Sequence, residues 1–215
     1  KTLKAELTKA RPKFGLKLEE GGETDGDGRH VWVVDPLDGT TNFLHGIPHF
    51  GISVALLQDG EPIAGVIHDP TRDEVFWAEK GNGAWMNDRR LRVSARKELS
   101  DCVIATGIPH HGRGDHEAFL KELPLVMTEA AGVRRFGSAA LDLAYVAAGR
   151  YDGFWERGLS AWDIAAGVLL VREAGGMVTE IDGGRKMLDS GRVLAANERV
   201  HIRLQRLFKR AARDE

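Results

Sequence analysis

The chain has 215 residues, 42% of them apolar, and its 30 basic and 32 acidic residues leave a net charge of −2. This near balance disfavours a general nucleic-acid or anionic-membrane binder, for which an excess of basic residues is expected. No apolar run approaches the roughly 20 residues that span a bilayer, and no secretory leader is recognisable, so we expect a cytoplasmic protein without a membrane segment.

The first half of the chain predicts a short helix followed by strands. Residues 1–10 show apolar side chains on one face and no N-cap before them, which indicates a helix that begins upstream. Pro12 ends this helix, and residues 14–18 form a short apolar piece before a polar loop. Asp59 and Gly60 are a strong hairpin signal between two strands. We expect strands over residues 31–34, 52–57, 62–68, 75–79, 84–87, 91–93 and 103–106.

The second half alternates helices and strands. Residues 119–131 favour a helix that Pro124 bends or interrupts. Residues 138–148 favour a helix that ends at Gly149, and Ser160 is a good N-cap for a helix over 161–174. We expect strands over residues 151–156, 177–181 and 193–196, and a last amphipathic helix capped by Asn197.

The order of these elements predicts the fold class. Strands come first and mixed elements follow, which indicates an α+β layered architecture. No linker or repeat divides the chain, so we expect one catalytic domain over residues 1–215, with tightly joined halves at about 1–107 and 108–215.

The segment DPLDGTT at residues 35–41 is the strongest candidate for chemistry. Asp35 and Asp38 follow a buried strand, and their hard oxygen ligands suit Mg²⁺ better than zinc. Gly39 and Thr40 begin a short helix, whose free backbone N–H groups can hold a phosphate. The competing interpretation is a turn in which the aspartates serve as turn former and N-cap.

Two further acidic positions have equally ordinary explanations. Glu19 and Glu20 stand in a glycine-rich loop, where adjacent acids usually form a solvated surface. Asp163 is the third helical position after the N-cap Ser160, where an acid stabilises the helix terminus. The residues alone leave both interpretations open.

Other kinds of site are disfavoured. His110, His111 and His116 lack the spacing of helical metal ligands, so we expect an exposed or substrate-facing loop. Ser53 and Ser138 lack the glycine-flanked elbow of a nucleophilic serine, and no Walker-type loop is present. The single cysteine, Cys102, lies in an apolar stretch, and we expect it to be buried and structural.

Three segments resemble the signatures of the inositol monophosphatase family. WVVDPLDGTTNF at residues 32–43 resembles the first signature. WDIAAG at residues 162–167, followed by EAGG at 173–176, is similar to the second. LEEG at residues 18–21 resembles an upstream element. The resemblance covers essentially the whole chain and implies a layered α/β/α/β/α sandwich of the inositol monophosphatase and fructose-1,6-bisphosphatase type, here without the first N-terminal helices.

The resemblance also implies roles for individual residues. The implied metal ligands are Glu19, Asp35, the Leu37 carbonyl, Asp38 and Asp163. The implied catalytic residues are Glu19, Thr40 and Asp38, with Glu19 and Thr40 acting on the attacking water. The implied substrate-binding residues are Gly39, Thr40, Gly137, Ser138, Ala139, Glu156 and Asp163.

The function that the resemblance implies is Mg²⁺-dependent hydrolysis of a small phosphate monoester, with myo-inositol 1-phosphate as the leading substrate. Two or three Mg²⁺ ions, inhibition by lithium and a homodimer are implied as well. The alternatives within this chemistry are fructose-1,6-bisphosphatase, histidinol-phosphatase and nucleotide 3′-phosphatase activity. Residues 107–115 are expected to help decide among them.

A function of a different class stays open. Some bacterial relatives of this family bind the transcription machinery, and a basic C-terminal helix could provide such a surface. Its basic residues are Arg203, Arg206, Lys209, Arg210 and Arg213. A solvated amphipathic helix explains the same pattern.

Overall fold

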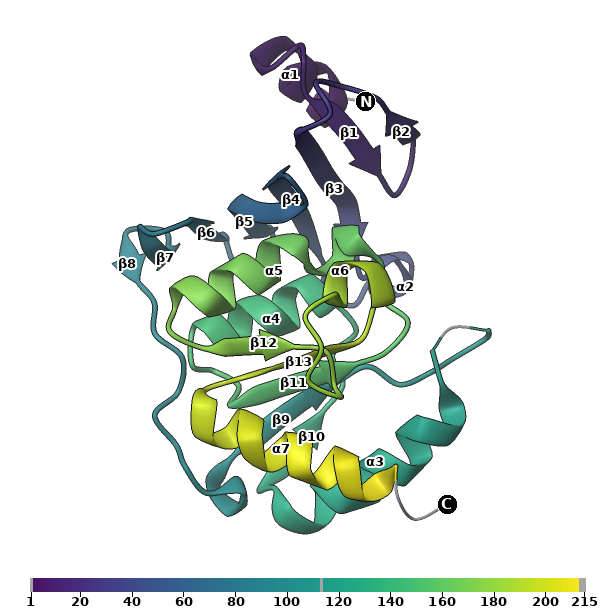
Figure 1. Ribbon diagram of the computed structural model, residues 1–215, viewed down its shortest axis with the longest axis vertical. Coiled ribbons are helices and arrows are strands. Elements are labelled where there is room, and N and C mark those ends of the chain that lie inside the picture. Colours follow the sequence, from purple (N-terminus) through teal and green to yellow (C-terminus); the bar gives the residue numbers. More distant parts are fainter. Residues whose placement is uncertain (1, 113, 213–215) are drawn as a thin grey trace.

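The computed structural model describes residues 2–112 and 114–212, and it shows two β-sheets alternating with helices (Figure 1). Helices α4 (Ala139–Ala147) and α5 (Ala161–Glu173) lie between the two sheets. Helices α3 (His116–Glu129) and α7 (Glu198–Ala211) cover the outer face of the second sheet. The outer face of the first sheet meets α1 (Thr2–Ala10) through Leu7. This layering confirms the predicted fold class.

The first sheet has eight strands in the described part of the chain, in the order β2-β1-β3-β4-β5-β6-β7-β8. Most neighbours are antiparallel, but β1 pairs parallel with β3. The strands are β1 (Gly15–Leu18), β2 (Gly22–Thr24), β3 (His30–Asp38), β4 (Gly51–Gln58), β5 (Glu61–Asp69), β6 (Glu74–Glu79), β7 (Gly83–Met86) and β8 (Arg89–Arg90).

The second sheet has five strands among the described residues, in the order β10-β9-β11-β13-β12. β9 is parallel to both of its neighbours, whereas β13 is antiparallel to its own. The strands are β9 (Val103–Thr106), β10 (Gly132–Arg134), β11 (Gly153–Glu156), β12 (Met177–Thr179) and β13 (Val193–Ala196). The remaining helices are α2 (Thr40–Leu44), α6 (Met187–Ser190) and the 3₁₀ helix η1 (Leu99–Asp101).

The structure corrects one predicted strand and one predicted break. Residues 91–93 do not form a strand. Leu91 N still donates to Ala84 O of β7 at 2.8 Å, but Val93 N donates to Ala174 O at 3.1 Å, because the chain leaves the sheet here for the end of α5. Pro124 lies inside a continuous α3, which begins at an N-cap, Asp115, whose side chain accepts from Ala118 N. The hairpin at Asp59 and Gly60 is confirmed, with φ values of 51° and 83° that match a type I′ turn.

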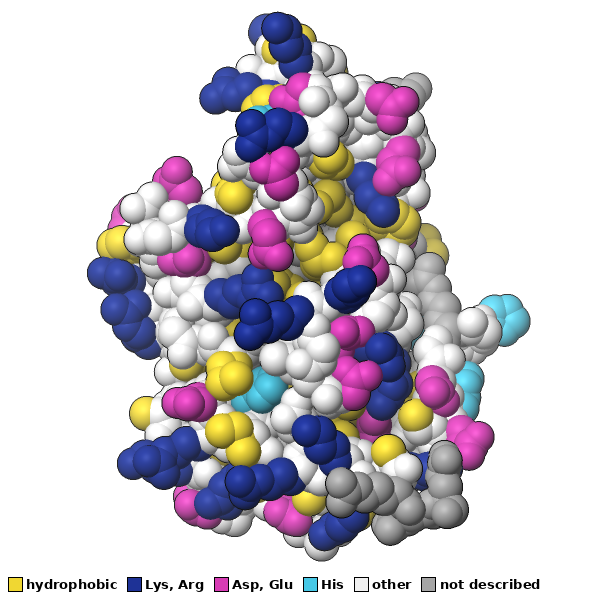
Figure 2. Space-filling model, in the orientation of Figure 1, with side chains coloured by type: hydrophobic (Ala, Val, Ile, Leu, Met, Phe, Trp, Pro, Cys, Tyr) yellow, Lys and Arg dark blue, Asp and Glu magenta, His cyan; other side chains and the backbone are white. Residues whose placement is uncertain are grey.

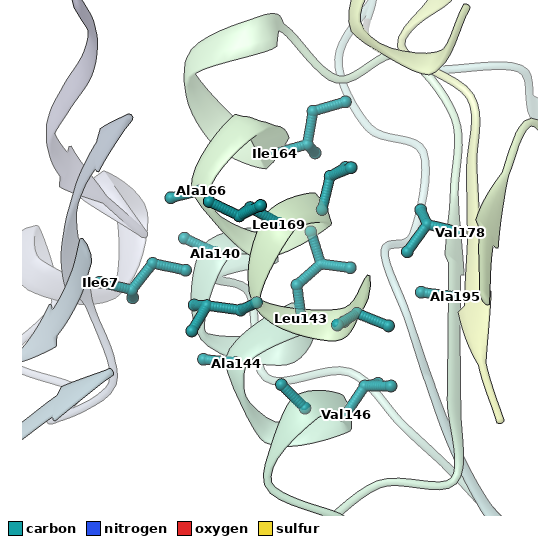
Figure 3. Packing of buried hydrophobic residues seen from close by; sticks show 14 of the residues in the cluster. Ile67, Ala140, Leu143, Ala144, Val146, Ile164, Ala166, Leu169, Val178 and Ala195 are labelled. Atoms are coloured by element: carbon teal, nitrogen blue, oxygen red, sulfur yellow. The ribbon is translucent and has the colours of Figure 1, made fainter. Parts of the chain in front are cut away.

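One apolar core joins both sheets to the helices between them (Figure 3). Ile67 of β5 faces α4 and α5 from one side, and Ala195 of β13 faces them from the other. The two helices approach closely at Gly167, where an added Cβ would lie 2.5 Å from Leu143 Cβ. Because the N-termini of α4 and α5 carry Ser138 and Asp163, this contact positions two of the residues discussed below.

Among the residues that the structure describes, no helix has the length and apolar character needed to cross a membrane.

Candidate active site

Three carboxylates from distant parts of the chain meet at one point. Asp35 and Asp38 come from the irregular end of β3, where the pairing with β4 shifts register. Asp163 comes from the first turn of α5. Each of the three offers one oxygen, and these oxygens lie within 4.8 Å of one another. Carboxylate oxygens at this spacing are a ligand set for a hard divalent cation.

Each carboxylate is held in place by a hydrogen bond to one of its oxygens. Leu37 N donates to Asp35 Oδ1 at 2.8 Å. Ser138 Oγ and Ala140 N donate to Asp38 Oδ2 at 2.6 and 2.7 Å. Ser160 N donates to Asp163 Oδ2 at 2.7 Å, within a capping box at the start of α5. The helix-capping interpretation of Asp163 is therefore correct, and its place in the carboxylate group is additional to it. The DPLDGTT segment likewise forms a turn and a helix start while it brings two acids to the cluster.

The cluster is electrostatically unfavourable in the absence of a cation. Burial, together with the neighbouring Asp38 carboxylate, raises the pKa of Asp35 to about 9. Burial raises the pKa of Asp38 to about 7, against the opposing effect of the Ser138 hydrogen bond. A divalent cation would relieve both the desolvation of these groups and their mutual repulsion. The donor set therefore fits a metal.

The carboxylates open into a cleft with a volume of about 360 Å³. Nearly all the residues that the sequence singled out line it. The predicted residues in its wall are Glu19, Asp35, Leu37, Asp38, Gly39, Thr40, Gly137, Ala139, Glu156 and Asp163. Ser138 is 1% exposed and stands behind the wall, where its hydroxyl binds Asp38.

The rim of the cleft beside Asp35 is formed by Glu19 and by the start of α2. Glu19 follows β1, its backbone N–H donates to Val34 O at 3.1 Å, and its side chain contributes to the raised pKa of Asp35. Thr40 Oγ1 donates to Leu37 O at 2.9 Å. Gly39 has a φ of 89°, and an added Cβ would lie 3.2 Å from Gly137 O, so both space and conformation require glycine.

Glu156 lies at the end of β11 and packs against Gly107. An added Cβ on Gly107 would lie 1.9 Å from the Glu156 carboxyl group, so Glu156 depends on the absence of a side chain there. Burial, reinforced by Asp38, raises the pKa of Glu156 to about 8. Residue 107 begins the loop that the sequence associated with substrate selection, and His110 of the same loop also lines the cleft. Arg113 of this loop lies outside the described residues.

Two charged residues of the cleft were not identified from the sequence. Arg135 and Asp142 both line it, and Asp142 is 1% exposed. Burial, with Glu156 and Asp38 nearby, raises the pKa of Asp142 well above its usual range. A signal was present, because Asp142 is the single charged residue in the otherwise apolar helix α4. Ionisable side chains are seldom fully buried without a partner, so an aspartate on a buried helix is a signal for a site.

The cysteine and the histidines agree with their predicted places. Cys102 is fully buried, and burial raises the pKa of its thiol to about 11, so it is structural. His110, His111 and His116 are exposed. In the described part of the chain, the acidic trio is the one group of three or more ligand-type side chains close enough to share a metal.

Comparison with known proteins settles the family. A family model described as the inositol monophosphatase family matches residues 1–213. The chain belongs to the inositol monophosphatase family. It is 61% identical over 207 residues to an inositol-1-monophosphatase of Mesorhizobium japonicum, which covers 96% of this chain and 78% of that protein.

Two further comparisons within this family involve proteins named SuhB. The chain is 48% identical over 201 residues to the Nus factor SuhB of Pseudomonas aeruginosa, covering 91% of this chain and 74% of that protein. The crystal structure of the extragenic suppressor protein suhB from Bartonella henselae matches with a TM-score of 0.92 and 58% identity, over 95% of this chain and 79% of that one. The predictions of the family fold and of a phosphoric monoester hydrolase are confirmed.

Proposed function

We propose that this protein hydrolyses a small phosphorylated polyol, with myo-inositol 1-phosphate as its preferred substrate, in a Mg²⁺-dependent reaction. The observation that carries the proposal is the meeting of Asp35, Asp38 and Asp163 in a cleft that also contains Glu156. The high identity to a protein named inositol-1-monophosphatase supports the choice of substrate.

The proposed metal ligands are the three clustered aspartates, Glu19 and the Leu37 carbonyl, which all line the cleft. This all-oxygen set suits two or three Mg²⁺ ions and is a poor match for softer metals. Bound Mg²⁺ would supply positive charge and would lower the pKa of water at neutral pH. The chain's own hydrogen bonds fix one oxygen of each aspartate, so the ligand oxygens are oriented before a cation arrives.

The remaining site residues would bind and orient the substrate. Gly39 and Thr40 begin α2, where backbone N–H groups lack helical partners and can donate to phosphate oxygens. Glu19 and the Thr40 hydroxyl would orient the attacking water. Gly137 and Ala139 would form the wall against the alcohol, and the Glu156 carboxyl group would accept hydrogen bonds from its hydroxyl groups.

The deciding assay is phosphate release from myo-inositol 1-phosphate, with Mg²⁺, with chelator and with added lithium. We expect activity with Mg²⁺ alone, and a loss of roughly a thousandfold in Asp38→Asn and Asp163→Asn. Asp88→Asn, at an exposed turn residue, is the matched control and should retain full activity. Unchanged rates in both cleft variants would refute the proposed metal site.

A panel of monoesters tests the choice of substrate. It contains fructose 1,6-bisphosphate, histidinol phosphate and a nucleoside 3′-phosphate beside myo-inositol 1-phosphate. We expect the highest kcat/KM for the inositol ester, because Glu156 favours an alcohol with further hydroxyl groups. A preference for the bisphosphate or the nucleotide would contradict the inositol assignment while leaving the hydrolase intact.

We propose a homodimer that forms through an exposed apolar patch. Phe43, Leu44, Ile47 and Phe136 are each more than 40% exposed, and Asn42 joins the two parts of the patch by donating to Phe136 O at 2.7 Å. Exposed apolar surface of this kind favours an interface. We expect Leu44→Asp to lower the molar mass measured by light scattering to that of a monomer. Leu120→Asp, at another strongly exposed leucine on α3, is the control and should leave the mass unchanged.

A second candidate function is binding of the transcription machinery, favoured by the identity to a Nus factor SuhB. Figure 2 shows Lys and Arg side chains gathered over α7. Arg206, Lys209 and Arg210 of this helix are exposed, while Arg203 pairs with Glu98 and Arg213 lies outside the described residues. In a pull-down, we expect Asp38→Asn to recover RNA polymerase as wild type does. The double variant Arg206→Glu, Arg210→Glu should no longer recover it. Arg89→Glu is the control for charge reversal, and loss with all three variants would contradict a surface on α7.

A further inference from the structure

We propose that Asp142 is a second carboxyl group that binds the alcohol part of the substrate, alongside Glu156, and that the pair selects polyhydroxy alcohols. This inference rests on the phosphatase function proposed above and extends it. It also rests on the place of Asp142. Its buried carboxyl group, with no hydrogen-bond partner on Oδ1 in the part of the chain that the structure describes, is part of the wall of the same cleft that contains the carboxylate cluster.

Asp142 occupies the first turns of α4, a helix whose residues are all buried. Its side chain is 1% exposed, yet it contributes to the surface of the cleft. Asp142 Oδ1 has no hydrogen-bond partner among the described residues. A buried polar atom left without a partner costs roughly 1–3 kcal/mol. Because Asp142 lines the cleft, a small rotation of its carboxyl group would bring this oxygen to a hydroxyl group of a molecule bound there.

Two buried aspartates outside the cleft, Asp152 and Asp69, show what a purely structural acid looks like in this fold. Asp152 accepts from Val103 N at 2.7 Å and from Arg96 Nη1 at 3.1 Å, which occupies both of its oxygens. Asp69 accepts from Thr71 and from Arg72, again through both oxygens. Asp142 differs from both, because the protein leaves one of its oxygens unpaired at a cleft. A fold-stabilising role therefore does not explain it.

The neighbourhood of Asp142 identifies the chemistry of the ligand. Glu156 lines the same cleft and is close enough to Asp142 for the two carboxyl groups to repel one another. Two adjacent carboxyl groups can accept hydrogen bonds from two hydroxyls of one alcohol. An esterified alcohol without further hydroxyl groups would displace water and leave these oxygens unpaired, which strongly disfavours its binding. The wall therefore selects a polyol.

The test compares two esters in wild type and in Asp142→Ala, with Mg²⁺ present. One ester is myo-inositol 1-phosphate, and the other is 4-nitrophenyl phosphate, whose leaving group has no further hydroxyl. We expect kcat/KM for the inositol ester to fall roughly 10- to 100-fold, mainly through KM, because a hydrogen bond to the buried Asp142 carboxyl group is lost. For the nitrophenyl ester we expect a change of no more than about twofold.

Inhibition by inorganic phosphate and the thermal unfolding midpoint are measured for each variant. Inhibition by phosphate should match wild type, because Asp142 does not contact phosphate in this proposal. The unfolding midpoint should be no lower than that of wild type, because Asp142 Oδ1 has no structural partner to lose among the described residues and its unpaired state is itself a cost. Asp142→Asn, which keeps the shape of the side chain, is the second variant and should show a smaller loss of the same selectivity. If Asp142→Ala does not fold, the asparagine variant decides.

The outcomes are distinguishable. Equal losses with both esters would overturn the proposal, because they indicate a general structural effect, and so would no change with either ester. A wild-type enzyme that releases phosphate from neither ester would refute the proposed phosphatase function instead. A selective loss with the inositol ester supports the assignment of Asp142.

Discussion

Ser138 Oγ lies 2.6 Å from Asp38 Oδ2, so the N-cap of α4 holds a carboxylate from the end of β3. Ala140 N donates to the same oxygen, which places the Asp38 carboxylate at the positive end of α4. A hydroxyl that caps one helix thus also orients a proposed metal ligand from another layer of the fold.

We expect Ser138→Ala to weaken Mg²⁺ binding roughly 10- to 100-fold, as for other groups that orient a metal ligand. Titration of activity against Mg²⁺ concentration measures the effect. Asn197→Ala removes an equivalent N-cap from α7, far from the cleft, and is the matched control. It should cost roughly 1–3 kcal/mol of stability, because Asn197 Nδ2 also donates to Ser94 O and Arg96 O, and it should not change the Mg²⁺ dependence. Equal Mg²⁺ dependence in Ser138→Ala and wild type would contradict the prediction.

Gly107→Ala should displace the Glu156 carboxyl group, because the added Cβ would lie 1.9 Å from it. We expect KM for the polyol ester to rise roughly 10- to 100-fold, since small displacements of a binding group have effects of this size. The control is the same substitution in a Glu156→Ala background, where no carboxyl group remains to be displaced. A further loss in that background would show that Gly107 acts through something other than Glu156.

Gly167→Ala tests the contact between α4 and α5. The added Cβ would lie 2.5 Å from Leu143 Cβ, so the helices must separate, at a cost of roughly 1–3 kcal/mol in the free energy of unfolding. Chemical denaturation measures this loss. In a Leu143→Ala background much of the crowding is absent, and the cost of the glycine substitution should shrink. An equal cost in both backgrounds would rule out this contact as the cause.

His201 should make stability depend on pH. It is 2% exposed, and Nε2 lies 3.0 Å from Thr179 Oγ1, whose own proton is donated to Glu180 O. Burial lowers the pKa of His201 from 6.5 to about 4. As the pH falls, His201 is therefore protonated in the unfolded chain before it is protonated in the folded one. The free energy of unfolding falls by up to roughly 3 kcal/mol as the pH drops from 6.5 to about 4.

Urea unfolding of wild type and His201→Gln across the same window measures this contribution. The variant should lose less stability than wild type on acidification, whereas His45→Gln, at an exposed histidine, should follow wild type. Parallel curves for wild type and His201→Gln would show that His201 does not titrate as its burial implies.

Local signals predicted most elements because each depends on neighbouring residues. The β4–β5 hairpin follows from Asp59 and Gly60, and α5 follows from its capping box at Ser160 and Asp163. The three-residue strand β10 was not predicted, since it is stabilised by parallel pairing with the distant β9 rather than by its own sequence. The parallel pairing of β1 with β3 is equally non-local.

The site residues also fall into those that the local sequence predicts and those that depend on tertiary packing. Asp35 and Asp38 could be recognised from their spacing after a buried strand, and their motif resembles a family signature. Asp142 could not, because its environment is created by α4 packing between two sheets and by the arrival of Glu156 from β11. The sequence pattern therefore identifies site residues that lie in one turn of the chain. Residues that meet only in the wall of the cleft are identified from the tertiary structure.

The separation of Asp35 and Asp163 along the chain has a consequence for unfolding. A cation bound by both would act as a reversible cross-link that closes a loop running through both sheets. Closing so long a loop removes conformational entropy from the unfolded chain. If the ion dissociates only after the two sheets have separated, it also slows unfolding. The proposed metal site would therefore also stabilise the fold, and depletion of the cation would lower the stability of the protein as well as its activity.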